Sequence, residues 1–260
     1  MDLDLAGRSV LVTGGSGGIG LATARAFAAE GCSLHLAARS AENLHAARAD
    51  ISRDFDVSVT VHPVDLSGPE NARRLAGTCA GADVLVNSAG AIPGGGIGEI
   101  DDERWREAWD LKVFGYVNMM RELYAEMKDR GRGVIVNVIG TAGDQRPADY
   151  AAGVSANAAL ATLTRALGGE SFDHGVRVVG VSPGDMTNER GVEFLRRRAA
   201  DELGDPDRWR ERLSRLPGGR AATSKDGADA ILFLASPRAG YVSGTVLTVD
   251  GGMGSRQRVI

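Results

Sequence analysis

Short apolar runs recur along the chain, and polar or helical stretches separate them. Continuous runs of this kind are typical of strands that are buried on both faces of a parallel sheet. They lie at residues 10–13, 33–39, 57–64, 83–90, 133–139, 176–182 and 244–252, of which 57–64 alternates between apolar and polar residues. We therefore predict an α/β fold with a three-layer, doubly wound parallel sheet of about seven strands.

Helical spacing of apolar residues appears between most of these runs. The pattern predicts helices over 21–30, 41–48, 104–128, 150–170 and 225–235. The apolar face of the 104–128 stretch carries tryptophan, tyrosine and methionine side chains, which is more typical of core packing than of a ligand site. We expect these helices to cover both faces of the sheet.

The first apolar run breaks into a glycine-rich turn that leads directly into a helical pattern. It reads VLVTGGSGGIG over residues 10–20. Glycines let the backbone turn tightly and approach a pyrophosphate, and the free N–H groups at the start of a helix receive its negative charge. We predict a nucleotide site formed by Gly14, Ser16, Gly18, Ile19 and Gly20 in a Rossmann-like fold.

The spacing of this loop, Thr-Gly-x-x-x-Gly-Ile-Gly, resembles that of the short-chain dehydrogenase/reductase family. Later motifs extend the resemblance over residues 10–252. The resemblance implies adenine contacts at the end of the third strand, close cofactor approach after the fourth strand and nicotinamide contacts after the sixth. In that order, the residues concerned are Asp65 and Leu66; Asn87, Ala89 and Gly90; and Pro183, Gly184 and Thr187.

The end of the second strand indicates which cofactor binds. In dinucleotide folds an acidic residue here binds the ribose 2′-hydroxyl, whereas an arginine accepts a 2′-phosphate. This chain has Ala38 and Arg39 at that place and no acid. We therefore expect NADP(H) to be favoured over NAD(H).

Composition narrows the classes of protein that the chain can belong to. Its 260 residues are 43% hydrophobic, which is enough for one sizeable core, and its net charge of −4 argues against binding to nucleic acid. No apolar stretch approaches the length of a membrane span, and the start lacks a secretion signal, so we expect a cytoplasmic protein with no membrane partner. Cys32 and Cys79 lack metal-ligand spacing, which favours buried reduced thiols and predicts no metal site.

The family resemblance implies a catalytic set of tyrosine, lysine, serine and asparagine. Hydride transfer to a carbonyl leaves an alkoxide that needs a proton, and the tyrosine supplies it. Alignment of the motifs places Gly153 at the tyrosine, Asn157 at the lysine, Gly140 at the serine and Lys112 at the asparagine. The chain therefore departs from the family pattern at all four positions.

Other residues near these positions are candidates for the missing chemistry. Tyr150 is the nearest tyrosine, although one helical turn displaces a residue by about 4.5 Å along the axis. Lys112 is a candidate to tune a proton donor by its charge or to protonate the product itself. Thr141, Asp144 and Asp149 lie on the loop nearest the expected nicotinamide. We select Tyr150, Lys112 and Thr141 as the catalytic candidates.

We expect one domain over residues 1–260 with an insertion around 188–220. That segment is rich in arginine and breaks the alternation of strands and helices, which is typical of a substrate lid at the carboxyl edge of a sheet. The alternative is a solvated helical pair, because acidic residues interleave with the arginines.

Two functions fit these observations. The first is an NADP(H)-dependent oxidoreductase that acts on a small carbonyl or alcohol with a non-standard proton donor. The second is a nucleotide-binding protein of the same fold that catalyses isomerisation, elimination or cyclisation, or that only binds its ligand. The resemblance, together with two long helices that are apolar over more than one face, predicts a homotetramer.

Overall fold

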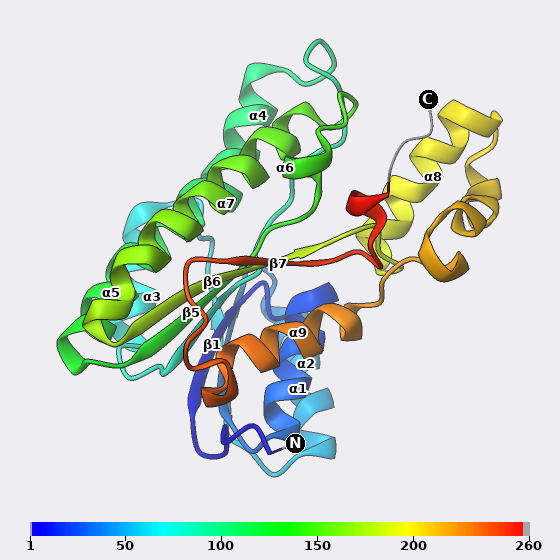
Figure 1. Cartoon of the computed structure of the whole chain (residues 1–260). Coiled ribbons are helices and arrows are strands. Elements are labelled where there is room, and N and C mark those ends of the chain that lie inside the picture. Colours follow the sequence, from blue (N-terminus) through cyan, green and yellow to red (C-terminus); the bar gives the residue numbers. More distant parts are fainter. Residues whose placement is uncertain (1, 257–260) are drawn as a thin grey trace.

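The computed structural model describes residues 2–256, and seven parallel strands run through its centre. Their order across the sheet is β3-β2-β1-β4-β5-β6-β7, which confirms the predicted doubly wound sheet (Figure 1). The chain changes direction across the sheet between β1 and β4, and this is where open α/β sheets bind ligands. The strands are β1 (Ser9–Thr13), β2 (Ser33–Ala38), β3 (Val59–Pro63), β4 (Val84–Asn87), β5 (Gly133–Val138), β6 (Val176–Pro183) and β7 (Val246–Val249).

Helices cover both faces of the sheet and make it the middle of three layers (Figure 1). Side chains alternate between faces along each strand, so Val10 and Val12 enter one core while Leu11 enters the other. The first core contains α1 (Gly18–Ala29), α2 (Ala41–Asp54) and α9 (Ser224–Ala235), and the second contains α3 (Pro69–Thr78), α5 (Gly115–Arg130) and α7 (Ala151–Ser171).

The helix predicted over 104–128 is interrupted. It consists of α4 (Asp102–Trp109), a π-helical turn η1 (Asp110–Phe114) and then α5. A π-helical turn inserts one extra residue into the helical repeat, and such turns often occur at functional sites. Here the turn carries Lys112, which is buried.

The sequence prediction also missed α3. Its buried positions are Ala72, Leu75 and Ala76, and Pro69 occupies the first turn, where the absence of an N–H costs nothing. Two of those residues are alanines, so the apolar signal was weak. Helix α2 extends six residues beyond the predicted end at residue 48, to Asp54.

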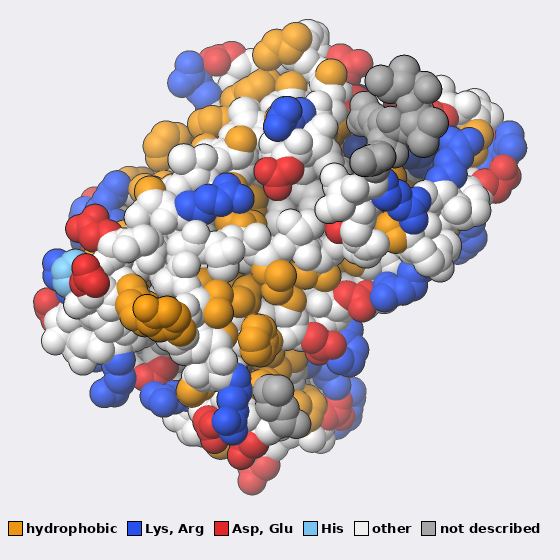
Figure 2. Space-filling model, viewed as in Figure 1, with side chains coloured by type: hydrophobic (Ala, Val, Ile, Leu, Met, Phe, Trp, Pro, Cys, Tyr) orange, Lys and Arg blue, Asp and Glu red, His pale blue; other side chains and the backbone are white. Residues whose placement is uncertain are grey.

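The segment beyond β6 stands outside the carboxyl edge of the sheet (Figure 1). It contains α8 (Glu189–Leu203) and the 3₁₀ segment η3 (Pro206–Arg215), and arginine side chains gather over it in Figure 2. Many of its arginines pair with acids within the segment, as Arg208 does with Glu211. Among the described residues, no helix is both long and apolar enough to cross a bilayer.

Candidate active site

The glycine-rich loop between β1 and α1 forms a cradle that larger residues would block. Gly14 has φ +68°, and a Cβ there would lie 2.9 Å from the backbone nitrogen of Ala89. A Cβ on Gly20 would lie 2.2 Å from the carbonyl oxygen of Gly14. The first turn of α1 contains no acidic residue, and its N-cap, Gly17, has no side chain to occupy the free N–H groups. These features fit the pyrophosphate of a dinucleotide.

Two adjoining cavities lie at the carboxyl edge of the sheet. The larger, about 930 Å³, is lined by Arg39, Asp65 and Gly90 among others, and the smaller, about 460 Å³, reaches from the glycine-rich loop to α7. Most of the predicted site residues line the smaller cavity. They are Gly14, Ser16, Gly18, Ile19, Ala89, Gly90, Lys112, Thr141, Tyr150, Pro183 and Gly184.

Four predicted cofactor residues lie elsewhere. Gly20 packs under the loop, and Leu66 is buried in the core. Asn87 is fully buried, and its Nδ2 donates to Asn137 Oδ1 at 3.0 Å in a network that ties β4 to β5. Thr187 is exposed, and its backbone N–H donates to the carbonyl of Ala222 at 2.9 Å. Their cofactor contacts stay predictions.

Tyr150 lies just outside α7, with φ −140° and ψ 45° at the N-cap. The displacement of about 4.5 Å expected for one helical turn assumes that Tyr150 is helical, whereas its backbone is not. Its side chain lies over Gly153 in the first turn of α7. A Cβ on Gly153 would lie 2.0 Å from both Cε1 and Cζ of the tyrosine ring. Tyr150 thus occupies the space in which a side chain at position 153 would begin.

Lys112 points into the sheet edge from the π-helical turn. Its Nζ donates to the carbonyl of Val138 at 2.7 Å and to the hydroxyl of Tyr116 at 3.2 Å. Burial and the nearby charge of Arg190 lower the pKa of Lys112 to about 7. Lys112 is therefore hydrogen-bonded to Tyr116 and to β5, and its influence on the proton donor stays a prediction.

Arg190, at the start of α8, supplies the charge that faces Tyr150. Burial raises the pKa of Tyr150, and Arg190 opposes that rise. The guanidinium also donates to the carbonyls of Gly90 and Ile92, each at 2.6 Å, so it joins α8 to the loop after β4. Phe194, one helical turn along α8, meets the Tyr150 ring edge-on with centroids 5.0 Å apart.

Arg190 and Phe194 are not among the site residues predicted from the sequence. The available signal was their placement three to seven residues after the Thr187 motif, on the face of an amphipathic helix that begins at the cofactor edge. Both residues line the two cavities.

The remaining catalytic candidates have different surroundings. Thr141 is buried and lines the smaller cavity. Asp149 faces Arg198 of α8 at 3.6 Å, and Asp144 is exposed. Asn157 fills the space beside Gly140, where a Cβ would lie 3.0 Å from its Nδ2.

The lowered pKa of Lys112 predicts a pH dependence of stability. The unfolded chain keeps this proton up to about pH 10.5, whereas the folded chain loses it near pH 7, so unfolding takes up a proton between those values. Raising the pH from 7 to 9 should therefore stabilise the fold through this group, by roughly 1 kcal/mol per pH unit. Lys112→Met should lack this contribution, as measured by denaturant unfolding at each pH.

Lys128→Met, an exposed lysine on α5, is the matched control and should keep the parent's pH dependence. Parallel pH profiles for the parent and Lys112→Met would show that Lys112 titrates normally.

A family model for short chain dehydrogenases matches residues 8–197. The chain therefore belongs to the short-chain dehydrogenase/reductase family. Galactitol 2-dehydrogenase (L-tagatose-forming) of Cereibacter sphaeroides is 34% identical over 250 residues, covering 95% of each protein.

Solved structures agree with this assignment. L-Sorbose reductase from Gluconobacter frateurii, complexed with NADPH and L-sorbose, has a TM-score of 0.89 and 31% identity over 99% of this chain and 100% of that one. A 7α-hydroxysteroid dehydrogenase complexed with NADH has a TM-score of 0.85 and 26% identity over 96% of each chain. One structure holds NADPH and the other NADH, so family membership alone does not decide between the two cofactors.

Proposed function

We propose that this protein is an NADP(H)-dependent oxidoreductase that acts on a small carbonyl or alcohol, with Tyr150 as its proton donor. The observation that carries the proposal is the position of the Tyr150 ring over Gly153, which is the residue aligned with the family's tyrosine. The tyrosine stands three residues before the aligned position, at 150 and not at 153. It nevertheless lines the same cavity as Lys112, Thr141 and Gly184.

The residues present fit a dinucleotide. The glycine cradle suits a pyrophosphate, Asp65 and Arg39 line the cavity expected to hold the adenosine end, and Pro183 and Gly184 line the other cavity. The nicotinamide, when bound, supplies or accepts the hydride. Arg39 is exposed and lines the larger cavity, so its charge is available to a 2′-phosphate.

Residues of the chain transfer the proton, orient the substrate and hold the site together. The Tyr150 hydroxyl donates a proton to the alkoxide in reduction and accepts it in oxidation. Arg190 favours the phenolate by its charge and holds α8 against the loop after β4. The Thr141 hydroxyl is placed at the cavity wall to orient a carbonyl oxygen. Lys112 keeps the end of β5 in place through Val138.

The lid and the assembly belong to the same proposal. The segment over 188–220 acts as the substrate lid, because its Arg190 and Phe194 reach the cavity wall next to Tyr150. The chain forms one domain, assembles as a homotetramer and works in the cytoplasm, as the resemblance and composition predict.

The test is NADPH oxidation by the purified protein with a panel of carbonyl compounds, followed at the nicotinamide absorbance. The panel begins with ketohexoses, because L-sorbose and L-tagatose appear with two similar proteins. Reduction of at least one carbonyl, with its alcohol recovered as product, is the expected result. Tight NADPH binding without turnover of any carbonyl or alcohol would instead support non-redox chemistry or a binding role.

Cofactor preference gives a second prediction. The parent should bind NADPH more tightly than NADH, and Arg39→Ala should weaken NADPH binding by about 10- to 100-fold because a charge-assisted contact to the phosphate is lost. Binding of NADH should change little. Fluorescence titration of both cofactors measures this.

Arg48→Ala on α2 removes another exposed arginine and is the matched control. Equal dissociation constants for NADPH and NADH in the parent would contradict the assignment of Arg39.

A further inference from the structure

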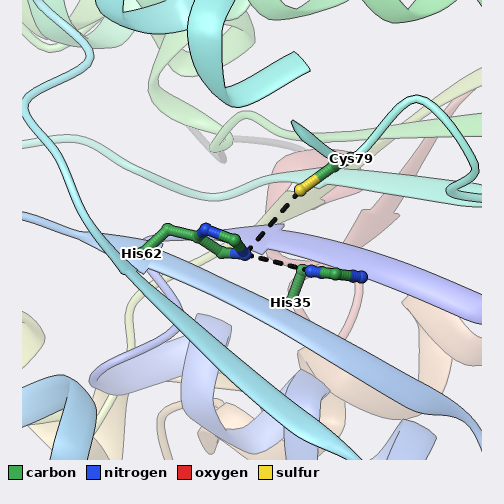
Figure 3. A group of neighbouring side chains, drawn as sticks. All are labelled: His35, His62 and Cys79. Carbon is green, nitrogen blue, oxygen red and sulfur yellow. Dashed lines mark hydrogen bonds between the residues drawn. The ribbon is translucent and has the colours of Figure 1, made fainter. Parts of the chain in front are cut away.

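Three potential metal ligands meet on the α3 side of the sheet, away from the cavities described above. His35 lies on β2, His62 on β3, and Cys79 caps the end of α3 (Figure 3). The strand register pairs Ala37 with His62, and residues 35 and 37 face the same side because strand side chains alternate. The two histidines are therefore diagonal neighbours, and their rings stack with centroids 5.2 Å apart.

The ligand atoms are close to the spacing of a metal site. His35 Nδ1 lies 3.0 Å from His62 Nε2, Cys79 Sγ lies 3.8 Å from the same nitrogen, and all three atoms lie within 4.8 Å of one another. Ligands of a tetrahedral zinc ion lie about 3.3–3.6 Å apart, given the usual Zn–N and Zn–S bond lengths. Small side-chain adjustments would bring all three atoms onto one ion.

Hydrogen bonds within the cluster cannot satisfy all three side chains at once. His62 Nε2 faces both His35 and Cys79, as the dashed lines in Figure 3 show. A ring nitrogen carries either one proton or one lone pair, so it serves only one of the two neighbours well. A cation placed between the three atoms would accept a lone pair from each.

We propose that His35, His62 and Cys79 bind a divalent transition-metal ion of the zinc class. Two imidazoles and a thiolate are borderline-to-soft donors, which select such an ion over Mg²⁺ or Ca²⁺. Both histidines are only partly buried, so water can complete a fourth position. The sequence analysis predicted no metal site, because the three residues are far apart along the chain.

Protonation of the ligands is compatible with metal binding. Burial lowers the pKa of both His35 and His62, which favours the neutral imidazole that a metal requires. Burial raises the pKa of Cys79 to about 11, so the thiol gives up its proton when the metal binds.

The position of the three ligands on β2, β3 and α3 gives the ion a structural role. It would tie β2, β3 and α3 together at the edge of the sheet. Strand β2 ends one residue before Arg39, and β3 ends two residues before Asp65. The ion would therefore brace the two strands that carry the residues predicted to bind the adenosine end of the cofactor.

The experiment is metal titration of tag-free protein that has been treated with a chelator and desalted. With Co²⁺ as the probe, we expect one ion per chain, a near-ultraviolet charge-transfer band from the thiolate and visible bands of tetrahedral cobalt. Competition against a chromophoric chelator should give an apparent Zn²⁺ dissociation constant of about 1 µM or tighter. Zn²⁺ should also raise the thermal unfolding midpoint of the parent.

Variants identify the ligands. Cys79→Ser should abolish the charge-transfer band, and His62→Gln should weaken Zn²⁺ binding at least about 10-fold and reduce the thermal shift. His45→Ala on α2, an exposed histidine, and Cys32→Ser, the other buried cysteine, are the controls and should keep the band.

Two results would overturn the proposal. One is the absence of a thiolate-to-cobalt band in the parent at saturating Co²⁺. The other is parent-like Zn²⁺ affinity in His62→Gln, which needs no change in the cysteine and keeps a polar side chain on β3.

Discussion

Tyr150→Phe is expected to lower kcat by about 10²- to 10⁴-fold, because it removes the proposed general acid and leaves the ring in place. The ring fills the space over Gly153 and packs against Phe194, so phenylalanine should preserve both contacts and the fold. NADPH affinity should stay close to that of the parent. Steady-state turnover with the best carbonyl from the panel, together with cofactor titration, measures both quantities.

Tyr124→Phe is the matched control. Its hydroxyl contacts His174 at 2.8 Å and neither residue lines the two cavities, so turnover should be unchanged. A Tyr150→Phe enzyme with parent-like kcat would exclude Tyr150 as the donor while leaving the reductase assignment to be judged by the carbonyl panel. Total inactivity of the parent would instead argue against the reductase itself.

Much of the fold was predictable because buried parallel strands need continuous apolar runs. Each of the seven predicted runs overlaps a strand, and Gly14 and Gly20 occupy positions where a Cβ would collide with the backbone. These requirements are local, so they can be recognised directly in the sequence. Helix α3 was missed because two of its buried positions are alanines, which give little hydrophobic contrast.

The arrangement of residues around the proposed proton donor was harder to predict from the sequence. The π-helical turn around Lys112 looks like ordinary helix in the apolar pattern, since the extra residue shifts the repeat only locally. The position of the Tyr150 ring over Gly153 depends on non-helical backbone torsion angles at Tyr150, and the apolar pattern of a helix does not predict those angles. Arg190 reaches carbonyls 98 and 100 residues away, which only the folded chain brings near.

The same limit applies to His35, His62 and Cys79. Local ligand motifs place two donors within a few residues, whereas here each donor comes from a different element. The strand register and the packing of α3 bring them together. Spacing along the chain therefore could not identify this cluster.

The residues at positions 150 and 153 are physically coupled. Tyr150 can lie over α7 only because Gly153 has no side chain, and a glycine inside a helix otherwise costs about 1 kcal/mol relative to alanine. The cost is understandable if the glycine makes room for a functional ring. Position 153 therefore controls where the phenol lies even though it contributes no reactive atom.

Gly153→Ala is expected to lower kcat by on the order of 10²-fold, because the new methyl group would displace the Tyr150 ring and misplace its hydroxyl by more than about 1 Å. The collision is with a side chain rather than with backbone, so the ring should move and the fold should persist. Thermal unfolding should confirm a folded protein. Gly169→Ala on the same helix is the matched control, since its Cβ would meet nothing within 4 Å.

A double variant separates a positioning role from a general loss of stability. If Gly153 acts through the phenol, adding Gly153→Ala to Tyr150→Phe should lower kcat by less than about threefold, because the hydroxyl that Gly153 positions is already absent. Full additivity of the two losses would place the effect of Gly153 elsewhere. Unchanged turnover in Gly153→Ala alone would show that the position of the ring over this glycine does not matter to the reaction.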